Sequence, residues 1–314
     1  MKRAVPSIAL AAALVLGAAA CGGGGSSDAS SDTTTTAAAG GSASDPAGSE
    51  GAKDLGGVLA LGEEFLLADL LSLGVTPVAS TATVADAGFL GMDDFDTEGI
   101  EILPNTEANF EQLAMLDIDT VIALQYVVDQ VGMEKLEALG EVIVAPTGTG
   151  ADELTELGKQ VGREEQAAEL VEQLGAAEAE AAGTAAEGCE VSLATIYSGV
   201  VPAAWVAAPN NVAIALQDMG CELAPSEADG DVDGAGRIYL SLENLGLLSA
   251  PELILLQTSA VEGEDEALAE IEQDPLWQQL PAVQADEVTT LDRLGYPGVA
   301  GLIRLYDELA QTVS

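Results

Sequence analysis

The stretch REEQAAELVEQLGAAEAEAAGTAA, residues Arg163–Ala186, is helical in character and carries no strand signal. One face of this helix is apolar, because small and apolar side chains follow the i, i+3, i+4, i+7 spacing at Ala167, Leu170, Val171, Leu174 and Ala177. Glu164 and Glu165 lie in the first turn, where the helix dipole favours acids. As one helix the stretch would be roughly 36 Å long, which is enough to cross between two lobes. A surface helix inside a single domain is the alternative.

Short apolar runs alternate with helical patterns before this stretch, as in parallel βαβ units. We expect strands at Val58–Leu61, Val75–Ala79, Asp119–Leu124 and Val142–Ala145. We expect helices at Glu63–Leu73, Ala108–Leu116 and Val131–Leu139, followed by a helical segment from Ala151 that breaks near Gly158 and Gly162. Because Pro77 cannot donate a ladder hydrogen bond, the second strand should be short or lie at a sheet edge.

The same alternation follows the stretch. We expect strands at Val191–Tyr197, Glu252–Gln257 and Glu287–Leu291, and helices at Asn211–Gly220, Leu242–Leu248, Glu264–Gln273 and Val299–Gln311. The fold class is therefore α/β, with two Rossmann-like α/β lobes joined by one long α-helix and a cleft between the lobes. Residues 55–150 form the N-terminal lobe, 151–188 the connecting helical segment and 189–314 the C-terminal lobe. Such clefts are favoured ligand sites.

The N-terminus has the pattern of a secretory signal peptide. Met1-Lys2-Arg3 precedes an apolar run from Ile8 to Leu16 and the small residues Gly17–Ala20. Cys21 follows directly, as in a bacterial lipobox, where the cysteine is lipidated and becomes the first mature residue. An ordinary signal peptide that leaves a free thiol is the alternative. Residues 21–54 are then a lipidated N-terminus and a disordered linker rich in Gly, Ser, Thr and Ala. We expect an extracytoplasmic body, anchored by lipid to the outer face of the cell membrane.

The charge of the chain excludes several classes of protein. The sequence has 53 Asp and Glu, 9 Lys and Arg and no His, for a formal net charge of −44. A nucleic-acid binder needs a basic face, so that class is excluded. The absence of His removes imidazole-based catalysis and His-ligated metals, and no metal site is expected. Hydrophobic residues make up 48% of the chain, which is enough for a large core.

Two further cysteines, Cys189 and Cys221, each lie just before an expected strand, and one helix separates them. In a right-handed βαβ unit such strands are often parallel neighbours. Their N-terminal ends would then be close enough for a disulfide, which a secreted setting permits. Two buried thiols are the alternative.

Several phrases, in order, resemble one family. They are Leu71-Ser72-Leu73-Gly74-Val75-Thr76-Pro77-Val78-Ala79, Asn109-Phe110-Glu111 before Asp119-Thr120-Val121-Ile122, Gly158 to Leu170, Ser241-Leu242-Glu243 before Leu253-Ile254-Leu255, and Asp274 to Val283. Over residues 55–314 the chain resembles the substrate-binding lipoproteins of ABC importers for ferric siderophores and cobalamin. Ile118 departs from the family, which usually has Pro there.

The resemblance implies a non-enzymatic binding protein that delivers a ligand to ABC permease and ATPase subunits. One surface glutamate on each lobe of this family engages arginines of the permease, and by position these are Glu111 and Glu243. Solvated surface acids are the alternative. A secreted carboxylate-based hydrolase and an adhesive lipoprotein are the alternatives from other classes.

Candidate ligand-binding residues follow from the strand ends, because ligands in α/β folds bind at the carboxyl ends of strands. We expect Tyr126, Trp205, Arg293 and Tyr296 in such loops, with Arg237, Tyr239 and Phe65 as weaker candidates and packing as the alternative for each. Trp277 is assigned to packing. No enzymatic cofactor is expected. Few cations remain to hold a polyanion, so a neutral or cationic ferric siderophore of the hydroxamate type is favoured, with cobalamin or haem as alternatives.

Overall fold

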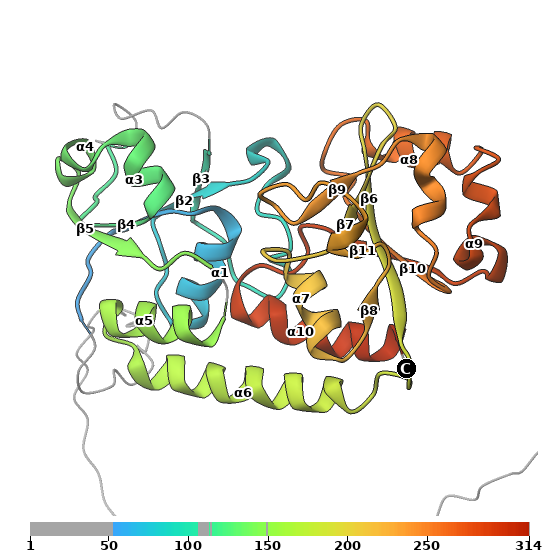
Figure 1. The fold of residues 1–314 in the computed structure, drawn as a ribbon. Coiled ribbons are helices and arrows are strands. Elements are labelled where there is room, and N and C mark those ends of the chain that lie inside the picture. The colour runs from blue at the N-terminus through green and yellow to red at the C-terminus, as the bar shows by residue number, and fades with distance from the viewer. Residues whose placement is uncertain (1–52, 106–112, 114, 149, 314) are drawn as a thin grey trace, which may run out of the picture. The chain divides into compact units, whose positions relative to one another are not determined.

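The computed structural model describes residues 53–105, 113, 115–148 and 150–313, and it contains two α/β lobes bridged by helices (Figure 1). The expected signal peptide, Cys21, the expected linker up to residue 52, Glu111 and most of the helix expected at Ala108–Leu116 lie outside the described residues. Within the described part of the chain, no helix combines the length and apolar character that a membrane crossing needs.

Sheet A belongs to the N-terminal lobe. Its described strands are all parallel, in the order β3-β2-β1-β4-β5. Their bounds are β1 Val58–Leu61, β2 Ala79–Ala82, β3 Glu101–Pro104, β4 Thr120–Leu124 and β5 Glu141–Ala145. This lobe also contains helix α1 (Glu63–Ser72), the short 3₁₀ helix η1 (Ala85–Ala87), α3 (Gln125–Val131) and α4 (Met133–Glu137).

The second strand corrects one prediction, because it begins at Ala79, where the expected strand ends. With 4 residues it is short, which was one of the two alternatives predicted from Pro77, and it lies between β1 and β3. Val75 is buried in an apolar cluster with Leu70, and its backbone N–H donates to Leu70 O at the end of α1. Pro77 lies in the link before the strand, so it removes no ladder hydrogen bond.

The helix expected at Val131–Leu139 is present in part, as α4 at Met133–Glu137, but the preceding helix α3 was not predicted. Helix α3 begins at Gln125, directly after β4, and Gly132 separates it from α4. Gly132 has φ 95°, a conformation that residues with a side chain rarely adopt, so the helical path ends there.

The connecting segment consists of helices α5 (Ala151–Val161) and α6 (Glu164–Ala182), with the break at Gly162 as expected. With 19 residues, α6 is shorter than the expected helix, at roughly 28 Å. The two helices pack closely, because a Cβ on Gly158 would lie 2.5 Å from the Ala167 Cβ. Helix α6 runs beneath both lobes, beside α10 (Gly298–Thr312) (Figure 1).

Sheet B belongs to the C-terminal lobe and is mixed. Its path is β11-β10-β6-β7-β9, with β8 paired to β6, and β7 is antiparallel to both of its neighbours. The strands are β6 Glu190–Tyr197, β7 Val201–Trp205, β8 Glu222–Leu223, β9 Arg237–Tyr239, β10 Glu252–Gln257 and β11 Val288–Asp292. The helices are α7 Asn211–Asp218, α8 Glu264–Ile271 and α9 Pro281–Ala285, with 3₁₀ turns η2 Glu227–Asp229, η3 Leu242–Leu247 and η4 Trp277–Gln279.

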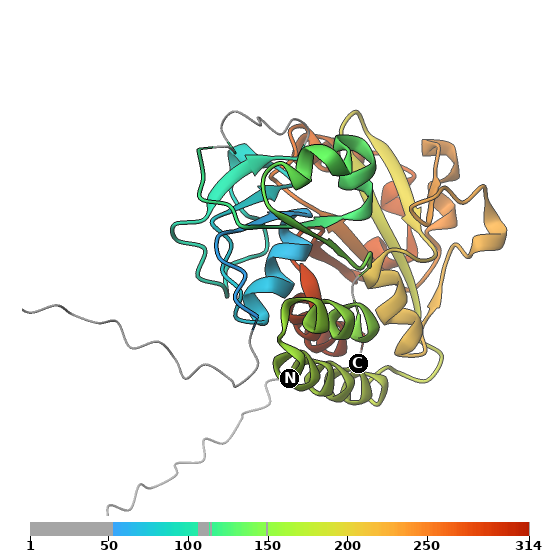
Figure 2. The ribbon, with the colours of Figure 1, turned by 90° about the vertical axis from the view of Figure 1, so that its left-hand side faces the viewer.

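One apolar cluster joins the two lobes through the bridging helices. It includes Leu70 of α1, Leu157 of α5, Leu174 of α6, Leu216 of α7 and Leu309 of α10, all of them buried. Seen from the side of the N-terminal lobe, α5, α6 and α10 lie together below sheet A (Figure 2). We call this cluster the interlobe core. Because it is continuous, the C-terminal helix of the second lobe also supports the first.

Polar contacts reinforce the same joint. The carboxylate of Asp69, on α1, accepts a hydrogen bond from the backbone N–H of Val299 in the first turn of α10, at 2.8 Å. Arg304 of α10 pairs with Asp94 and donates to the carbonyl oxygen of Gly91. Both contacts connect residues more than two hundred positions apart, so they hold the two lobes together directly.

A disulfide joins Cys189 and Cys221, with a Cα–Cα distance of 4.6 Å. The short strand β8 runs parallel to β6, with Glu222 opposite Glu190. The two cysteines therefore lie at adjacent strand starts, the arrangement expected from the sequence.

We predict that this disulfide stabilises the protein by constraining the unfolded chain. The cysteines are 32 residues apart, for which loop closure contributes roughly 3–4 kcal/mol. A Cys21→Ser chain, denatured without reductant, should titrate no free thiol, and two thiols after reduction. Reduction should lower the urea midpoint of this chain and leave that of the Cys189→Ala/Cys221→Ala double variant unchanged. Two thiols before reduction would show that the bond is absent.

We also predict that Asp69 makes stability depend on pH. Burial raises the pKa of Asp69 from 3.8 to about 7, and the hydrogen bond from Val299 N–H opposes this only in part. Between these values the folded state holds a proton that the unfolded state has lost. The stability contributed by protonated Asp69 is therefore present below pH 4 and falls away as the pH rises to 7, by roughly 4 kcal/mol.

Asp69→Asn should remove this pH dependence, because the amide oxygen can still accept from Val299 N–H and the side chain does not ionise. The free energy of unfolding, measured in urea from pH 4 to pH 8, should favour the variant increasingly as the pH rises. Parallel curves for the two proteins would contradict the prediction.

Candidate functional site

A cavity of about 380 Å³ lies between the lobes, and residues of both lobes and of α5 line it. The N-terminal lobe contributes Phe65, Leu66 and Asp69 from α1 and Leu124 at the end of β4. The C-terminal lobe contributes Trp205, Leu256 and Arg293 at or just after strand ends, and Leu305 from α10. The cleft predicted between the lobes therefore exists, and most of the side chains named here are apolar.

Aromatic and cationic side chains gather on the C-terminal lobe beside the cavity. Three rings surround the Arg237 guanidinium, whose central carbon lies 5.6 Å from the ring centre of Tyr197, 5.3 Å from that of Trp205 and 5.1 Å from that of Tyr239. Arg237 also donates to the Tyr197 hydroxyl at 2.9 Å and pairs with Asp233 at 2.8 Å. Each cation–π contact contributes about 0.5–2 kcal/mol, depending on its exposure, so this aromatic cluster is held rigidly.

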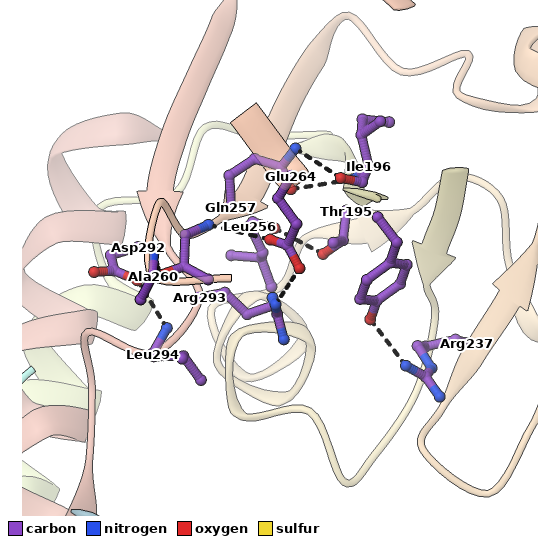
Figure 3. A network of polar contacts seen from close by, with 12 residues as sticks. Thr195, Ile196, Arg237, Leu256, Gln257, Ala260, Glu264, Asp292, Arg293 and Leu294 are labelled. Carbon is purple, nitrogen blue, oxygen red and sulfur yellow. Dashed lines mark hydrogen bonds and ion pairs between the residues drawn. The ribbon is translucent and has the colours of Figure 1, made fainter. Parts of the chain in front are cut away.

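Arg293 follows β11 and joins the same cluster from the other side. Its guanidinium lies 5.4 Å from the centre of the Tyr197 ring and donates to the Glu264 carboxylate at 2.5 Å (Figure 3). Glu264 is only 1% exposed, and burial raises its pKa above the ordinary value even beside Arg293. Arg293 Nε is buried and has no hydrogen-bond partner among the described residues. The cavity therefore has a cationic side chain whose charge a buried acid already balances.

Four polar side chains follow the carboxyl ends of four neighbouring strands of sheet A. They are Glu63 after β1, Thr83 after β2, Asn105 after β3 and Tyr126 after β4. The Glu63 carboxylate accepts from Asn105 Nδ2 at 3.0 Å and from the Tyr126 hydroxyl at 3.2 Å. The Thr83 hydroxyl lies 3.1 Å from Glu63 and makes its shorter hydrogen bond, at 2.6 Å, to Glu64. We call the four side chains that follow the strands the N-lobe polar cluster. Burial, with Glu63 nearby, raises the pKa of Tyr126 to about 12, so its hydroxyl remains a donor at neutral pH.

The structure brings together some of the predicted binding residues and separates others. Trp205, Arg293 and Tyr296 line the cavity, as does Phe65, whereas Tyr126 and Arg237 do not. Tyr296 donates to Glu308 at 2.6 Å, and burial raises its pKa well above the usual range. Arg237 and Tyr239 lie on β9 and reach the site only through the aromatic cluster.

Trp205 and Tyr126 were expected in loops, but each lies in a regular element. Trp205 ends strand β7, because Ser198 and Gly199 turn the chain back into a hairpin with β6. Its indole N–H donates to Thr195 Oγ1 at 2.9 Å, which fixes the ring against the sheet. Tyr126 lies in the first turn of α3, because that helix begins directly after β4. Trp277 is buried in a separate apolar cluster of the C-terminal lobe, which confirms its assignment to packing.

Several residues of the site were not predicted from the sequence, among them Tyr197, Asp69 and Glu264, and Glu63, Thr83 and Asn105 of the N-lobe polar cluster. Tyr197 ends β6, so the strand-end rule that selected Tyr126 could have found it. Asp69 and Glu264 gave no usable signal, because each is one acid on a helix in a chain with 53 acids.

Glu243 is exposed in the first turn of η3. Among the described residues, no group of three or more Cys, Asp or Glu side chains is arranged to hold a metal ion.

Comparison with known proteins adds to this geometry. A search of curated proteins found no match. Many solved structures have a similar fold, among them the following three. Staphylococcus aureus SirA complexed with staphyloferrin B is 18% identical, with a TM-score of 0.67 over 83% of this chain and 94% of that chain. The triscatecholate siderophore binding protein FeuA from Bacillus subtilis, complexed with ferri-bacillibactin, is 18% identical, with a TM-score of 0.66 over 82% and 91%. The siderophore periplasmic binding protein from the fuscachelin gene cluster of Thermobifida fusca is 21% identical, with a TM-score of 0.63 over 82% and 95%.

At these identities the solved structures establish a shared fold. The family comparison goes further, because the sequence model described as periplasmic binding protein matches residues 60–293, most of the chain. The two lobes, the bridging helices and the cavity between the lobes agree with that match. The chain belongs to the periplasmic binding protein family.

Proposed function

We propose that this chain is the extracytoplasmic siderophore-binding component of an ABC importer, which captures a ferric siderophore and passes it to a membrane permease without chemical turnover. The observation that carries the proposal is the cavity between the lobes, walled by Trp205 and Arg293 on one side and by Phe65 on the other. Family membership and the siderophores named for the three solved structures support it.

The charges around the cavity favour a neutral or cationic chelate of the hydroxamate type. Each arginine near the ligand already has an acidic partner, Arg237 with Asp233 and Arg293 with Glu264. Two further carboxyl side chains, Asp69 and Glu153, line the cavity, and Glu63 belongs to the N-lobe polar cluster. A polyanionic catecholate chelate would have to displace a protein carboxylate from each arginine, whereas a neutral chelate need not.

We predict that ferric hydroxamates quench the fluorescence of Trp205 in a saturable manner, with micromolar or tighter affinity. Trp205 lines the cavity, and Trp277 is buried in a different cluster. The signal should therefore vanish in Trp205→Phe and persist in the matched control Trp277→Phe. Ferric catecholates, cobalamin and haem complete the panel. If a catecholate, cobalamin or haem binds tightly and no hydroxamate does, that compound becomes the assigned ligand class. If no compound of the panel gives a saturable response, the proposed function is refuted.

We further propose how the protein reaches and contacts its membrane partners. Cys21 carries the lipid anchor after removal of residues 1–20, and the linker lets the body move above the membrane surface. Glu111 and Glu243, on separate lobes, engage permease arginines by charge-assisted hydrogen bonds. The exposure of Glu243 on a short, fixed turn supports this role.

We predict that Glu111→Ala and Glu243→Ala leave siderophore affinity in solution unchanged and reduce uptake by cells that depend on this importer. Glu243 is exposed and does not line the cavity, and Glu111 is proposed as its counterpart from its sequence position, so we expect each variant to impair docking alone. Glu227→Ala, which removes an exposed acid elsewhere on the C-terminal lobe, is the matched control and should transport normally. Weaker binding in solution by either docking variant, or normal uptake by both, would contradict the docking role.

A further inference from the structure

The cavity contains a carboxylate that the fold leaves half satisfied. Asp69 lines the cavity from α1, and its Oδ1 accepts from the Val299 N–H at 2.8 Å. None of the described residues donates a hydrogen bond to Asp69 Oδ2. A buried carboxylate has room for several donors and loses much hydration free energy when it lacks them. Among the described residues no donor reaches Asp69 Oδ2, so a donor on an occupant of the cavity could bind this oxygen.

The side chains around Asp69 favour a cationic donor. The other charged side chains that line the cavity are Glu153 and Arg293, and buried Glu264 already neutralises the guanidinium of Arg293. Much of the rest of the cavity lining is apolar and includes Leu66, Leu124, Leu157, Leu256 and Leu305. Burial raises the pKa of Asp69 to about 7, so the surrounding protein compensates the charge of this carboxylate only in part. A cation that enters the cavity would stabilise the ionised carboxylate.

Building on the proposed siderophore function, we propose that Asp69 is a specificity-determining residue for siderophores that carry a protonated amine. A flexible arm of the chelate enters the cavity and its ammonium group donates to Asp69 Oδ2. The apolar residues cover the methylene groups of the arm, while the iron-bearing part lies beside the aromatic cluster of Tyr197, Trp205 and Arg237.

A purely structural role for Asp69 is the competing explanation, since its carboxylate also holds the first turn of α10. Asp69→Asn separates the two roles. The amide oxygen can still accept from Val299 N–H, so the lobe contact survives, but the neutral side chain no longer pairs with an ammonium group. A melting temperature that is not below that of the wild type will show that the variant is folded.

The test compares two probes on the full-length protein, by quenching of Trp205 fluorescence. One is a ferric trihydroxamate with a free primary ammonium arm, and the other is the same chelate with that amine acetylated. A hydrogen bond to a charged group gives about tenfold or greater discrimination, so the wild type should prefer the ammonium probe by that factor. Asp69→Asn should lose the preference by binding the ammonium probe more weakly, and should bind the acetylated probe as the wild type does.

Glu153→Gln is the matched control, because it removes one negative charge from the lining of the same cavity. It should keep most of the preference. Equal wild-type affinity for the two probes would overturn the proposal. So would an equal loss for both probes in Asp69→Asn, or loss of the preference in Glu153→Gln instead. If neither probe binds the wild type, the hydroxamate function itself fails, and the proposal with it.

Discussion

The site depends on the joint between the lobes, where α10 of the C-terminal lobe packs against α6 and α1. Leu70, Leu174 and Leu309 belong to one interlobe core, and the Asp69–Val299 hydrogen bond crosses it. The cavity opens directly beside this joint, with Leu66 and Leu305 in both its lining and the core. Moving the lobes apart would expose that apolar area at about 25 cal/mol per Å². The two walls of the cavity are thus held at a set spacing by burial.

Charge is distributed around the site with little free positive charge. In the C-terminal lobe Arg237, Arg293 and Arg304 each pair with an acid, and the first two also contact aromatic rings. The guanidinium groups of Arg237 and Arg293 pack on the aromatic rings, and these contacts within the protein fix the arrangement of the aromatic cluster. In a chain with a formal net charge of −44, this arrangement leaves the cavity attractive to neutral and cationic molecules.

Elements that contain a run of apolar residues were predicted correctly from the sequence. The prediction failed for elements that are buried only through contacts with distant parts of the chain. Strands β1, β4, β6 and β10 have such runs, whereas β2 is Ala-Ser-Thr-Ala and gains its place only from pairing with β1 and β3. Trp205 was expected in a loop, but the hairpin of β6 and β7 places it at the end of a strand. The strand-end rule found Arg293, and it would also have found Tyr197. No local pattern marks Asp69, because its burial depends on α10, more than two hundred residues later.

Asp69 contributes to the contact between the lobes and also lines the cavity. In many two-lobed binding proteins selectivity can be expressed through closure around the ligand, but a continuous interlobe core opposes a wide hinge motion here. Selectivity must then reside in side chains that are already in place. Asp69 meets that condition, since one oxygen is fixed by the first turn of α10 and the other lacks a donor among the described residues. The contact that fixes the lobes therefore also orients the group that we infer reads the charge of the ligand.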